Sequence, residues 1–555
     1  MDSPSSFLAP NGRLAARIPG WEPRPQQIVM ADLVAAAIDQ KKHAIIEAGT
    51  GTGKSLAYLI PAVLAATADQ AHQEENQPEQ QQQTGHEDQK SEKTNEKRPR
   101  RIVIATHTIA LQEQLVKKDI PLVSAVMPHE FSAVLVKGRG NYISLRRMEL
   151  AKEREGSLFQ YDEEVAELDG LLEWSGNTRD GSLADLPTIP RSSVWDEVHS
   201  DSGNCMGRTC PRYSDCHYFA ARRRMNNAQV LVVNHALFFS DLALRRSGVS
   251  LLPEYDIVIL DEAHMVESVA SDHLGVGLSS IAAERLLSRL YNERTNRGLL
   301  VHYKLDDLRP DVIQARRIAE DFFSGIIHAV ADRGDGPWRI LEPNLVPNTL
   351  GEVLLSLGRK IRKASDRLSS DAERQDFQSL ADRLTSQAGS IRFWLEQDDP
   401  GSVWWVELAN SRRGAPRVKL ASSPIDVSGV LRRDLFSKVD TVVLTSATLS
   451  TGTQSEAFDD TFDTENEHDA KEIGFHYLCE RLGVESAIKR QLDSPFDYES
   501  QAELVLVNRL PDPSSKHEYD RAVAEMLRSF VVDQQGRTMV LFTSHQALAS
   551  ASGEL

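Results

Sequence analysis

A short glycine-rich loop constrains the fold of this chain more than any other feature of its sequence. Residues 47–55 read Glu-Ala-Gly-Thr-Gly-Thr-Gly-Lys-Ser, between the apolar pair Ile45 and Ile46 and a helix-like apolar run at 56–60. Glycines let the backbone approach an anion closely, and N–H groups at the start of the following helix can bind it. A glycine turn with a surface lysine is the alternative, which the strand–loop–helix setting disfavours. The candidate residues of this polyphosphate site are Ala48, Gly49, Thr50, Gly51, Thr52, Gly53, Lys54 and Ser55.

The chain also offers the carboxylates that a nucleoside triphosphate site requires. In a loop of this pattern the lysine reaches the β- and γ-phosphates, and the serine hydroxyl binds Mg²⁺. The apolar run at 256–260 predicts a buried parallel strand, and Asp-Glu-Ala-His follows it at the edge where ligands bind. We expect Asp261 to hold Mg²⁺ and Glu262 to polarise the attacking water, with His264 as a further catalytic candidate. A polar helix start is the alternative, but the two motifs together predict hydrolysis of a nucleotide.

Composition and charge narrow the class of protein. The chain has 555 residues, 41% hydrophobic and 26% charged, which is typical of soluble proteins of roughly three or four domains. It has no apolar run near the roughly 18 residues of a membrane span and no secretory signal, so we expect a cytoplasmic monomer. The net charge of −18 does not exclude nucleic acid, because basic clusters occur at 97–101, 146–147 and 222–224. Each cluster is equally typical of a solvated face.

The order of predicted elements indicates an α/β fold with a parallel, doubly wound sheet. A Gln/Glu/Asp-rich stretch at 68–98 predicts a disordered loop. A cysteine-bearing insertion at 137–235 and a helical module at 277–397 interrupt the sheet, and a hairpin is predicted within 402–420. The main strand candidates lie at 101–106, 229–233, 256–260 and 439–444.

A second alternation of strand and helix begins after Phe496. It consists of a strand at 502–507, a helix at 517–532 and a strand at 538–542, after which the sequence ends. Parallel sheets normally have covered faces and protected edges, and this sheet would have about two strands. We therefore expect the chain to be a fragment, or the remaining half to come from elsewhere.

Three of the four cysteines, Cys205, Cys210 and Cys216, lie within twelve residues, while Cys479 is remote from them. In a cytosolic protein of this size, such spacing indicates metal ligation rather than a disulfide framework. Zinc held by the three thiolates and His217 is one candidate. An insertion that holds no metal is the alternative.

Five segments of the chain stand in the order of superfamily 2 helicase motifs. They are Arg24-Pro25-Gln26-Gln27, the loop at 48–55, Ala105-Thr106-His107-Thr108, the tetrad at 261–264, and Thr445-Ser446-Ala447-Thr448. Lys-Gly-Arg-Gly-Asn-Tyr at 137–142, the cysteine cluster, and the segments 232–237 and 542–544 add to the series. Over nearly its whole length the chain resembles the DinG branch of the XPD-like DNA helicases.

The resemblance implies ATP-driven 5′ to 3′ movement along single-stranded DNA by a bacterial-type, nucleoid-associated protein. Gln27 would read the adenine, with Gln26 as the alternative register. Thr106 and His107 would contact the DNA backbone without reading sequence; a capped helix start is the alternative for both. The remaining candidates are Arg139 and Tyr142 for DNA binding, and Thr445, Ser446 and Thr448 for coupling between nucleotide and DNA.

The resemblance also implies a division of the chain. It predicts two RecA-like domains, the first interrupted by an iron–sulfur insertion and a helical arch. The expected segments are 1–136 for the first part of motor domain 1, 137–228 for the cysteine insertion, 229–276 for the continuation of domain 1, 277–400 for the arch, 401–455 for the completion of domain 1, and 456–555 for a linker and an incomplete motor domain 2.

The chain departs from the family pattern at two places. Ser144 stands where the first cluster cysteine is expected, so the three remaining cysteines would bind a [4Fe–4S] or smaller cluster with Ser144, water or a neighbour as the fourth ligand. The segment that carries the arginine finger does not follow Phe542. Because such an arginine contributes about 10³ to 10⁵ in turnover, we expect this chain to bind ATP weakly and barely hydrolyse it.

Two hypotheses follow. The first is an ATP-dependent 5′–3′ DNA helicase of repair or replication, of which this chain is the greater part. The second is a hydrolytically silent fragment that binds single-stranded DNA. A phosphate-loop ATPase that acts on protein is a third possibility, but it gives no reason for the insertion at 137–235.

Overall fold

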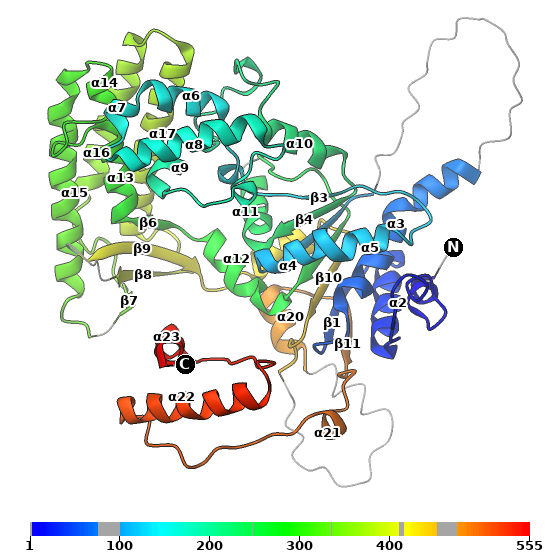
Figure 1. Cartoon of the computed structure of the whole chain (residues 1–555). Helices are drawn as coiled ribbons and strands as arrows, with labels where there is room; N and C mark the ends of the chain where they lie inside the picture. Colours follow the sequence, from blue (N-terminus) through cyan, green and yellow to red (C-terminus); the bar gives the residue numbers. More distant parts are fainter. Residues whose placement is uncertain are drawn as a thin grey trace, which may run out of the picture. The chain divides into compact units, whose positions relative to one another are not determined.

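The computed structural model describes residues 3–75, 100–246, 248–334, 336–409, 416–451 and 474–554. The chain divides into two compact units, Met1–Pro495 and Phe496–Leu555, whose helices and strands are labelled in Figure 1. The first unit contains a parallel sheet, a cysteine-bearing insertion and a helix-rich module, and each unit is described by itself.

A parallel sheet organises the first unit. Within the described ranges it has seven strands in the order β11-β1-β10-β5-β2-β4-β3, and every neighbouring pair runs parallel. Strands β2, β5 and β10 are buried along their whole length, as expected for strands covered on both faces. The prediction of an α/β fold with a parallel sheet is confirmed. The strands are β1 (His43–Ala48), β2 (Ile102–Thr106), β3 (Ala133–Leu135), β4 (Val230–Asn234), β5 (Ile257–Asp261), β10 (Thr441–Ser446) and β11 (Ala487–Leu492).

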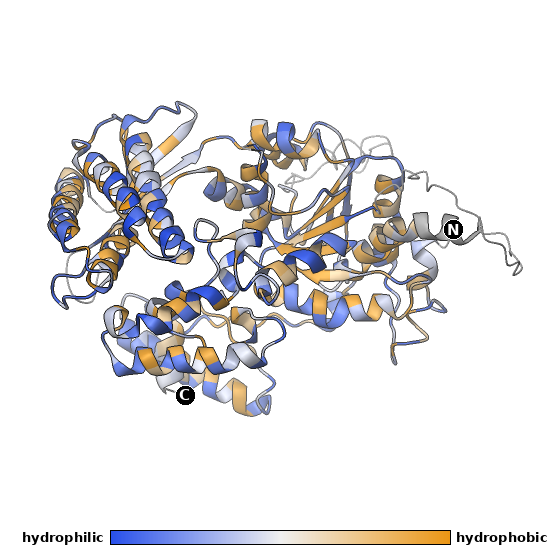
Figure 2. Cartoon of the chain, turned by 90° about the horizontal axis from the view of Figure 1, so that it is seen from above, coloured by the Kyte–Doolittle hydropathy of each residue, from blue (hydrophilic) through white to orange (hydrophobic). Residues whose placement is uncertain are grey.

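Alternate side chains of these strands enter two separate cores, because successive residues of a strand point to opposite faces. Ile46 and Ile259 pack with α1, α2 and α3 on one face. Ile45 and Val258 pack with α11, α12 and α20 on the other, and Figure 2 shows the strands between these layers as strongly hydrophobic. The covering helices are α1 (Pro4–Leu8), α2 (Pro25–Asp39), α3 (Lys54–Glu75), α11 (His235–Arg245), α12 (Val266–Leu274) and α20 (His476–Leu482).

Strand β11 was not expected. The sequence at 487–492 was assigned to a linker and a second domain, whereas the structure pairs it with β1 at the edge of the first sheet. Lys489 and Arg490 in this strand are typical of an edge, where charges prevent pairing with other chains. Those charges also remove the apolar pattern by which a strand is recognised.

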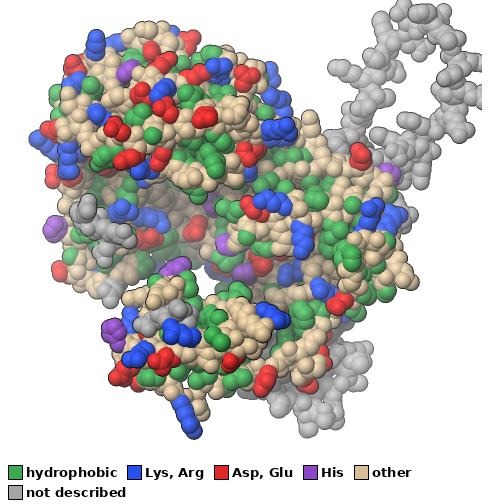
Figure 3. Space-filling model, viewed as in Figure 1, with side chains coloured by type: hydrophobic (Ala, Val, Ile, Leu, Met, Phe, Trp, Pro, Cys, Tyr) green, Lys and Arg blue, Asp and Glu red, His purple; other side chains and the backbone are tan. Residues whose placement is uncertain are grey.

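The helix-rich module contains its own antiparallel sheet, in the order β6-β9-β8-β7. The hairpin of β8 and β9, which we expected to complete the first motor domain, instead pairs with β6 and β7. Its side chains Trp404 and Leu420 lie in the core of the helices. The module is therefore not wholly helical, contrary to the prediction from the sequence. Strands β6 and β7 were missed because they are too short to show an alternating pattern. Acidic and basic side chains are intermixed over the surface of the region that holds this module and the cysteine-bearing insertion (Figure 3).

The elements of this module lie between residues 277 and 424. They are β6 (Gly277–Ser279), α13 (Ser280–Leu290), α14 (Leu299–His302), α15 (Arg309–Val330), β7 (Trp338–Arg339), α16 (Thr349–Ala364), α17 (Asp371–Glu396), β8 (Ser402–Ala409) and β9 (Arg417–Pro424).

The cysteine-bearing insertion has a small core of its own. Ile143, Met148 and Leu168 are among the buried residues that pack together there. This core orders the segment on both sides of the cysteines. The helices of the insertion are α6 (Leu145–Glu153), α7 (Glu155–Leu158), α8 (Asp162–Asn177), α9 (Ser192–Val198) and α10 (His217–Asn227).

The second unit is helical in the structure. Its helices are α21 (Tyr498–Gln501), α22 (Lys516–Asp533) and α23 (His545–Glu554), and α22 confirms the helix expected at 517–532. The strands expected at 502–507 and 538–542 do not form, and Leu504 and Leu506 are 83% and 80% exposed. Strands need hydrogen-bonded partners, and within the described part of this unit no strand pairs with these segments. The start of a second RecA-like sheet is therefore not observed.

Helix α3 is longer than expected. It continues to Glu75, so residues 68–75, assigned to a disordered loop, are helical. The rest of that predicted loop, 76–98, lies outside the described residues. Among the helices that are described, none combines the length and the apolar character needed to cross a bilayer.

Candidate functional site

The glycine-rich loop connects β1 to α3 and adopts a conformation that its glycines permit. Gly51 and Gly53 have φ angles of 85° and 80°, in the left-handed region that favours glycine. A Cβ at Gly53 would overlap the amide of Gln27, whose Nε2 donates to the Gly53 carbonyl at 2.9 Å. Arg24 donates to the Gly51 carbonyl. The start of α2 and the loop are thus held together.

Two further side chains of the loop take part in its closure. Thr52 donates through Oγ1 to the Gly49 carbonyl at 2.8 Å. Lys54 Nζ donates to the Ala48 carbonyl at 3.1 Å, so the lysine folds across the loop. Thr50 lies in the same turn between β1 and α3.

A cavity of about 330 Å³ lies beside the loop. Its wall includes Gln27 and Asp119, which are buried. Trp21 and Ser55, which are half-buried, also line it. An aromatic face next to amide and hydroxyl groups is a suitable surface for a nucleobase. Trp21 and Asp119 were not identified from the sequence, since neither belongs to a recognisable motif.

Asp261 lies on the same sheet edge as the loop. Strand β10 separates its strand β5 from β1, and the Tyr58 hydroxyl of α3 donates to Asp261 Oδ2 at 3.1 Å. The same hydroxyl interacts with Ser55, and burial with the nearby Asp261 charge raises the Tyr58 pKa. One phenol therefore lies beside both predicted Mg²⁺ ligands, Ser55 and Asp261. Sequence analysis missed Tyr58, although it lies one helical turn after Lys54.

The carboxyl of Asp261 is buried, and the positive charge of Lys54 offsets that burial only in part. It is 5% exposed. Burial, and then the neighbouring Glu262 charge, raise the pKa of Asp261 to about 6. A divalent cation at this position would reverse both effects, because it favours the charged carboxylate.

Glu262, His264 and Ser446 form a contact group at the ends of β5 and β10. Ser446 Oγ donates to Glu262 Oε2 at 3.2 Å, and His264 Nδ1 lies 2.7 Å from the same hydroxyl. Glu262 has a φ of 55°, a strained conformation for a residue with a side chain and one that concentrates at functional sites. Two predicted catalytic residues, Glu262 and His264, thus contact one predicted coupling residue, Ser446.

The other coupling candidates differ in their surroundings. Thr445 is fully buried opposite Asp261 in the pairing of β10 with β5. The Thr448 backbone N–H lies 3.5 Å from Ser446 Oγ. Ser446 is therefore the member of the set that joins the carboxylate of Glu262 directly.

The two candidate DNA contacts after β2 do not have the same exposure. Thr106 is fully buried, and its hydroxyl donates to the Thr108 carbonyl at 3.3 Å. His107 is exposed and its ring lies 6.0 Å from that of His235. The helix cap that we weighed as an alternative is made by Thr108, whose hydroxyl accepts from Leu111 N–H. Of the two candidates, His107 alone reaches solvent.

Arg139 and Tyr142, the other DNA candidates, point into the cysteine insertion. The Arg139 guanidinium lies 4.0 Å from the ring centroid of Tyr218 and donates to Cys205 Sγ at 3.4 Å. Tyr142 is buried, and burial raises its pKa to about 12. Both side chains therefore contact the insertion; Tyr142 is buried there and Arg139 is half-buried.

The three clustered cysteines and Ser144 line one small cavity of about 20 Å³. Ser144 caps α6 and lines the same cavity. The donor set of three sulfur atoms and one hydroxyl fits the composition of a cluster site with one replaced ligand.

The zinc alternative fits less well. His217, its proposed fourth ligand, does not line the cysteine cavity, and its ring lies directly against Gly181. Over the described residues, no three His, Cys, Asp or Glu side chains are grouped closely enough to hold a single metal ion, and this applies to the three cysteines whichever metal is considered. Cys479 lies in α20, in the core beneath the sheet, and does not line the cavity either.

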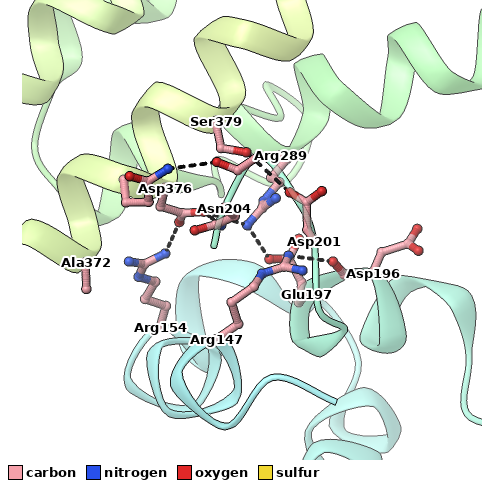
Figure 4. Close-up of polar contacts among 12 residues, drawn as sticks. Arg147, Arg154, Asp196, Glu197, Asp201, Asn204, Arg289, Ala372, Asp376 and Ser379 are labelled. Carbon is pink, nitrogen blue, oxygen red and sulfur yellow. Dashed lines mark hydrogen bonds and ion pairs between the residues drawn. The ribbon is translucent and has the colours of Figure 1, made fainter. Parts of the chain in front are cut away.

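A buried network of charges joins the cysteine insertion to the helix-rich module, as Figure 4 shows. Arg154 donates to Asp376 of α17 at 2.6 Å, and both side chains are nearly inaccessible. Arg289 of α13 lies 3.1 Å from both Asp376 and Glu197. Asn204, the residue before the first cysteine, donates to Asp376 at 2.7 Å. The backbone that leads into the cysteine cluster is therefore fixed against the module.

Comparisons with known proteins agree with these motifs. The DEAD/DEAH box helicase family model matches residues 25–146, and the DEAD_2 model matches residues 204–282. The solved structure titled XPD_Helicase aligns with 96% of this chain and 75% of its own at 13% identity, with a TM-score of 0.46.

Similar curated proteins cover nearly the whole chain. The ATP-dependent DNA helicase YoaA of Escherichia coli is 30% identical over 97% of this chain and 74% of the relative. YoaA of Haemophilus influenzae is 27% identical over 98% of the chain and 74% of the relative. The ATP-dependent DNA helicase DinG of Photobacterium profundum is 26% identical over 96% and 75%. The chain belongs to the DinG/YoaA family of ATP-dependent DNA helicases.

Proposed function

We propose that this chain binds and hydrolyses ATP at the β1–α3 loop and uses it to move 5′ to 3′ along single-stranded DNA. The observation that carries the proposal is the convergence of the loop, Asp261 and Glu262 on one sheet edge, across the adjacent strands β1, β10 and β5. Nucleotide sites of α/β sheets lie at such an edge. We expect it to act as a monomer.

In this proposal the loop N–H groups bind the phosphates, and Lys54 exchanges the Ala48 carbonyl for a phosphate oxygen. Ser55 and Asp261 would hold Mg²⁺, which neutralises phosphate charge when bound. Glu262, oriented by Ser446, polarises the attacking water. Gln27, with Gln26 as the alternative register, and Trp21 border the pocket for the base.

We propose a DNA-contacting role for His107, on the exposed side of the turn after β2. Thr106 would act indirectly, by fixing that turn through its bond to Thr108. Arg139 and Tyr142 would act by holding the cysteine insertion in place. The predicted segments keep their bounds in this proposal, except that the β8–β9 hairpin goes with the arch and β11 with motor domain 1.

The ATPase test measures the low turnover expected of the 555-residue chain, with and without single-stranded DNA. Lys54→Ala and Glu262→Gln should abolish hydrolysis, whereas Lys41→Ala, at a lysine that is 65% exposed, should not. Displacement from a duplex with a 5′ tail but not from one with a 3′ tail would support the polarity, and the reverse preference would contradict it. DNA binding without hydrolysis would favour the alternative, a silent DNA-binding fragment.

We also propose that Cys205, Cys210 and Cys216 hold an iron–sulfur cluster with Ser144 at the fourth position. Iron and zinc content of anaerobically purified protein, with its visible spectrum, tests this. Cys210→Ser should lower the iron content, Ser144→Cys should raise it, and Cys479→Ser should leave it unchanged. Colourless protein with stoichiometric zinc would contradict the cluster.

A further inference from the structure

Glu47, which no sequence motif assigned to a role, is bonded on several sides at the end of β1. It is 9% exposed. Its Oε2 accepts from the backbone N–H groups of Leu449 and Ser450, each at 2.6 Å, and from the Ser450 hydroxyl at 2.9 Å. Its Oε1 accepts from Gln491 Nε2 at 2.7 Å. Four donors from two remote segments thus converge on one carboxylate.

Those two segments have particular places in the chain. Leu449 and Ser450 directly follow Thr448, the last of the coupling candidates at the end of β10. Gln491 belongs to β11, the last described strand of the first unit. This strand ends three residues before Pro495, the last residue of the unit. Glu47 itself lies two residues before Gly49, the first glycine of the phosphate loop.

The loop also lies near the segment that follows β11. The Cα of Ser494 lies 3.4 Å from the position that a Cβ on Gly49 would take. The space between the loop and this segment would therefore hold little more than a methyl group.

The carboxylate of Glu47 is charged in this setting. Burial alone would raise its pKa, but the hydrogen bonds from Ser450, Leu449 and Gln491 outweigh burial, and the pKa lies below its ordinary value. Hydrogen bonds to a charged acceptor are roughly twice as strong as neutral ones. An amide keeps the side-chain volume but has one acceptor oxygen, so it would weaken the contacts of that oxygen and place an N–H group against the donors on the other side.

We propose that Glu47 is a positioning residue that connects the phosphate loop to the coupling segment after β10 and to β11, so that occupation of the loop by nucleotide is transmitted to the exit of the first unit. The inference rests on the proposed function, since it requires nucleotide at the loop. Glu47 does not touch the nucleotide itself in this proposal. Variants of Glu47 should therefore still bind nucleotide, but binding should no longer affect the segment after β10 or β11.

Hydrogen–deuterium exchange with and without Mg·ADP tests the transmission directly. In the wild-type chain, nucleotide should protect the peptides that contain Leu449–Ser450 and β11 as well as the loop. In Glu47→Gln the loop should stay protected, with an ADP dissociation constant within about threefold, and the other two peptides should lose their protection. Glu485→Gln, an exposed glutamate before β11 (72% exposed), is the matched control and should behave as wild type.

Steady-state kinetics give a second measurement. Glu47→Gln should lower the DNA-stimulated kcat by about tenfold, as expected for the loss of roughly one charge-assisted hydrogen bond, and leave the KM for ATP nearly unchanged. Gln491→Leu should act in the same direction, and the double variant should be no worse than Glu47→Gln alone, because the two side chains share one contact.

Three results would overturn the inference. If Glu47→Gln loses ADP binding in proportion to activity, the residue only shapes the loop. If the protection of β11 persists in Glu47→Gln, or if the effects of the two substitutions simply add, Glu47 transmits nothing. Absence of ADP binding by the wild-type chain would instead reject the proposed function, and this inference with it.

Discussion

Two aspartates of the first unit are almost equally buried and yet have opposite electrostatic surroundings. Asp261 is 5% and Asp376 is 2% exposed. Asp261 faces a second carboxylate, and its pKa is raised to about 6. Burial would raise the pKa of Asp376 as well, but Arg289, Arg154 and Arg147 hold it far below the ordinary value.

The difference separates a structural charge from one that awaits a partner. Asp376 has its cations within the fold, so its charge is compensated when the chain folds. Asp261 lies beside the phosphate loop, where the charge of Lys54 lowers its pKa by less than burial and Glu262 raise it. A bound cation would compensate the rest of its charge. A buried carboxylate whose charge the protein compensates only in part is a candidate for a ligand site.

The largest effect that this comparison predicts is on stability. Asp376→Asn leaves Arg154 and Arg289 buried without their shared counter-charge, which typically costs roughly 3–5 kcal/mol. The unfolding midpoint in urea should fall accordingly. Asp307→Asn breaks an ion pair with Arg367 in which both side chains are more than half exposed, and it should leave the midpoint nearly unchanged. Equal effects of the two substitutions would remove the distinction between Asp376 and a surface charge.

The second effect is on catalysis. Asp261→Asn removes a predicted Mg²⁺ ligand and should lower the ATPase rate by about 100-fold or more. Because it also removes a buried charge that Lys54 compensates only in part, it should leave the unfolding midpoint unchanged or raise it. Asp440→Asn, at an aspartate that is 56% exposed, is the control for both measurements. A variant that loses stability together with activity would place Asp261 with Asp376 as a structural residue.

Sequence reasoning located the sheet and the nucleotide site because both depend on local patterns. Each polar motif of the site follows an apolar run, and in a parallel sheet the ends of such runs meet at one edge. The strands expected at 101–106, 229–233, 256–260 and 439–444 correspond to β2, β4, β5 and β10. Their order across the sheet is what brings Asp261 beside the loop.

The features that escaped the sequence depend on contacts between remote or polar segments. Strand β11 carries edge charges, and the β8–β9 hairpin takes its partners from strands of two and three residues. The side chain of Glu47 bonds to residues about 400 positions away, for which no local spacing gives a signal. Arg139 contacts Tyr218 and Cys205 within the insertion. The sequence motif that contains Arg139 does not reveal these contacts.

The smallest predicted effect concerns pH and sharpens the comparison further. In the absence of Mg²⁺, the fold favours the protonated carboxyl of Asp261, because its folded pKa lies above the unfolded value. Its stabilising contribution is fully present below about pH 4 and is lost as the pH rises through about 6. Relative to Asp261→Asn, the wild-type chain should therefore lose about 1 kcal/mol of stability between pH 5 and pH 8.

Asp376 should show no such slope over the same range. Its folded pKa is depressed, so its contribution is present above the unfolded pKa of about 4 and is lost only in more acidic solution. Urea unfolding of wild type, Asp261→Asn and Asp376→Asn at pH 5 and pH 8 in EDTA measures both slopes.

Because Glu262 contributes to the raised pKa of Asp261, Glu262→Gln should reduce the first slope, that of Asp261, without changing the slope of Asp376. Saturating Mg²⁺ with nucleotide should abolish the first slope, since a bound cation favours the charged carboxylate, and a slope that survives would mean that the cation does not bind at Asp261.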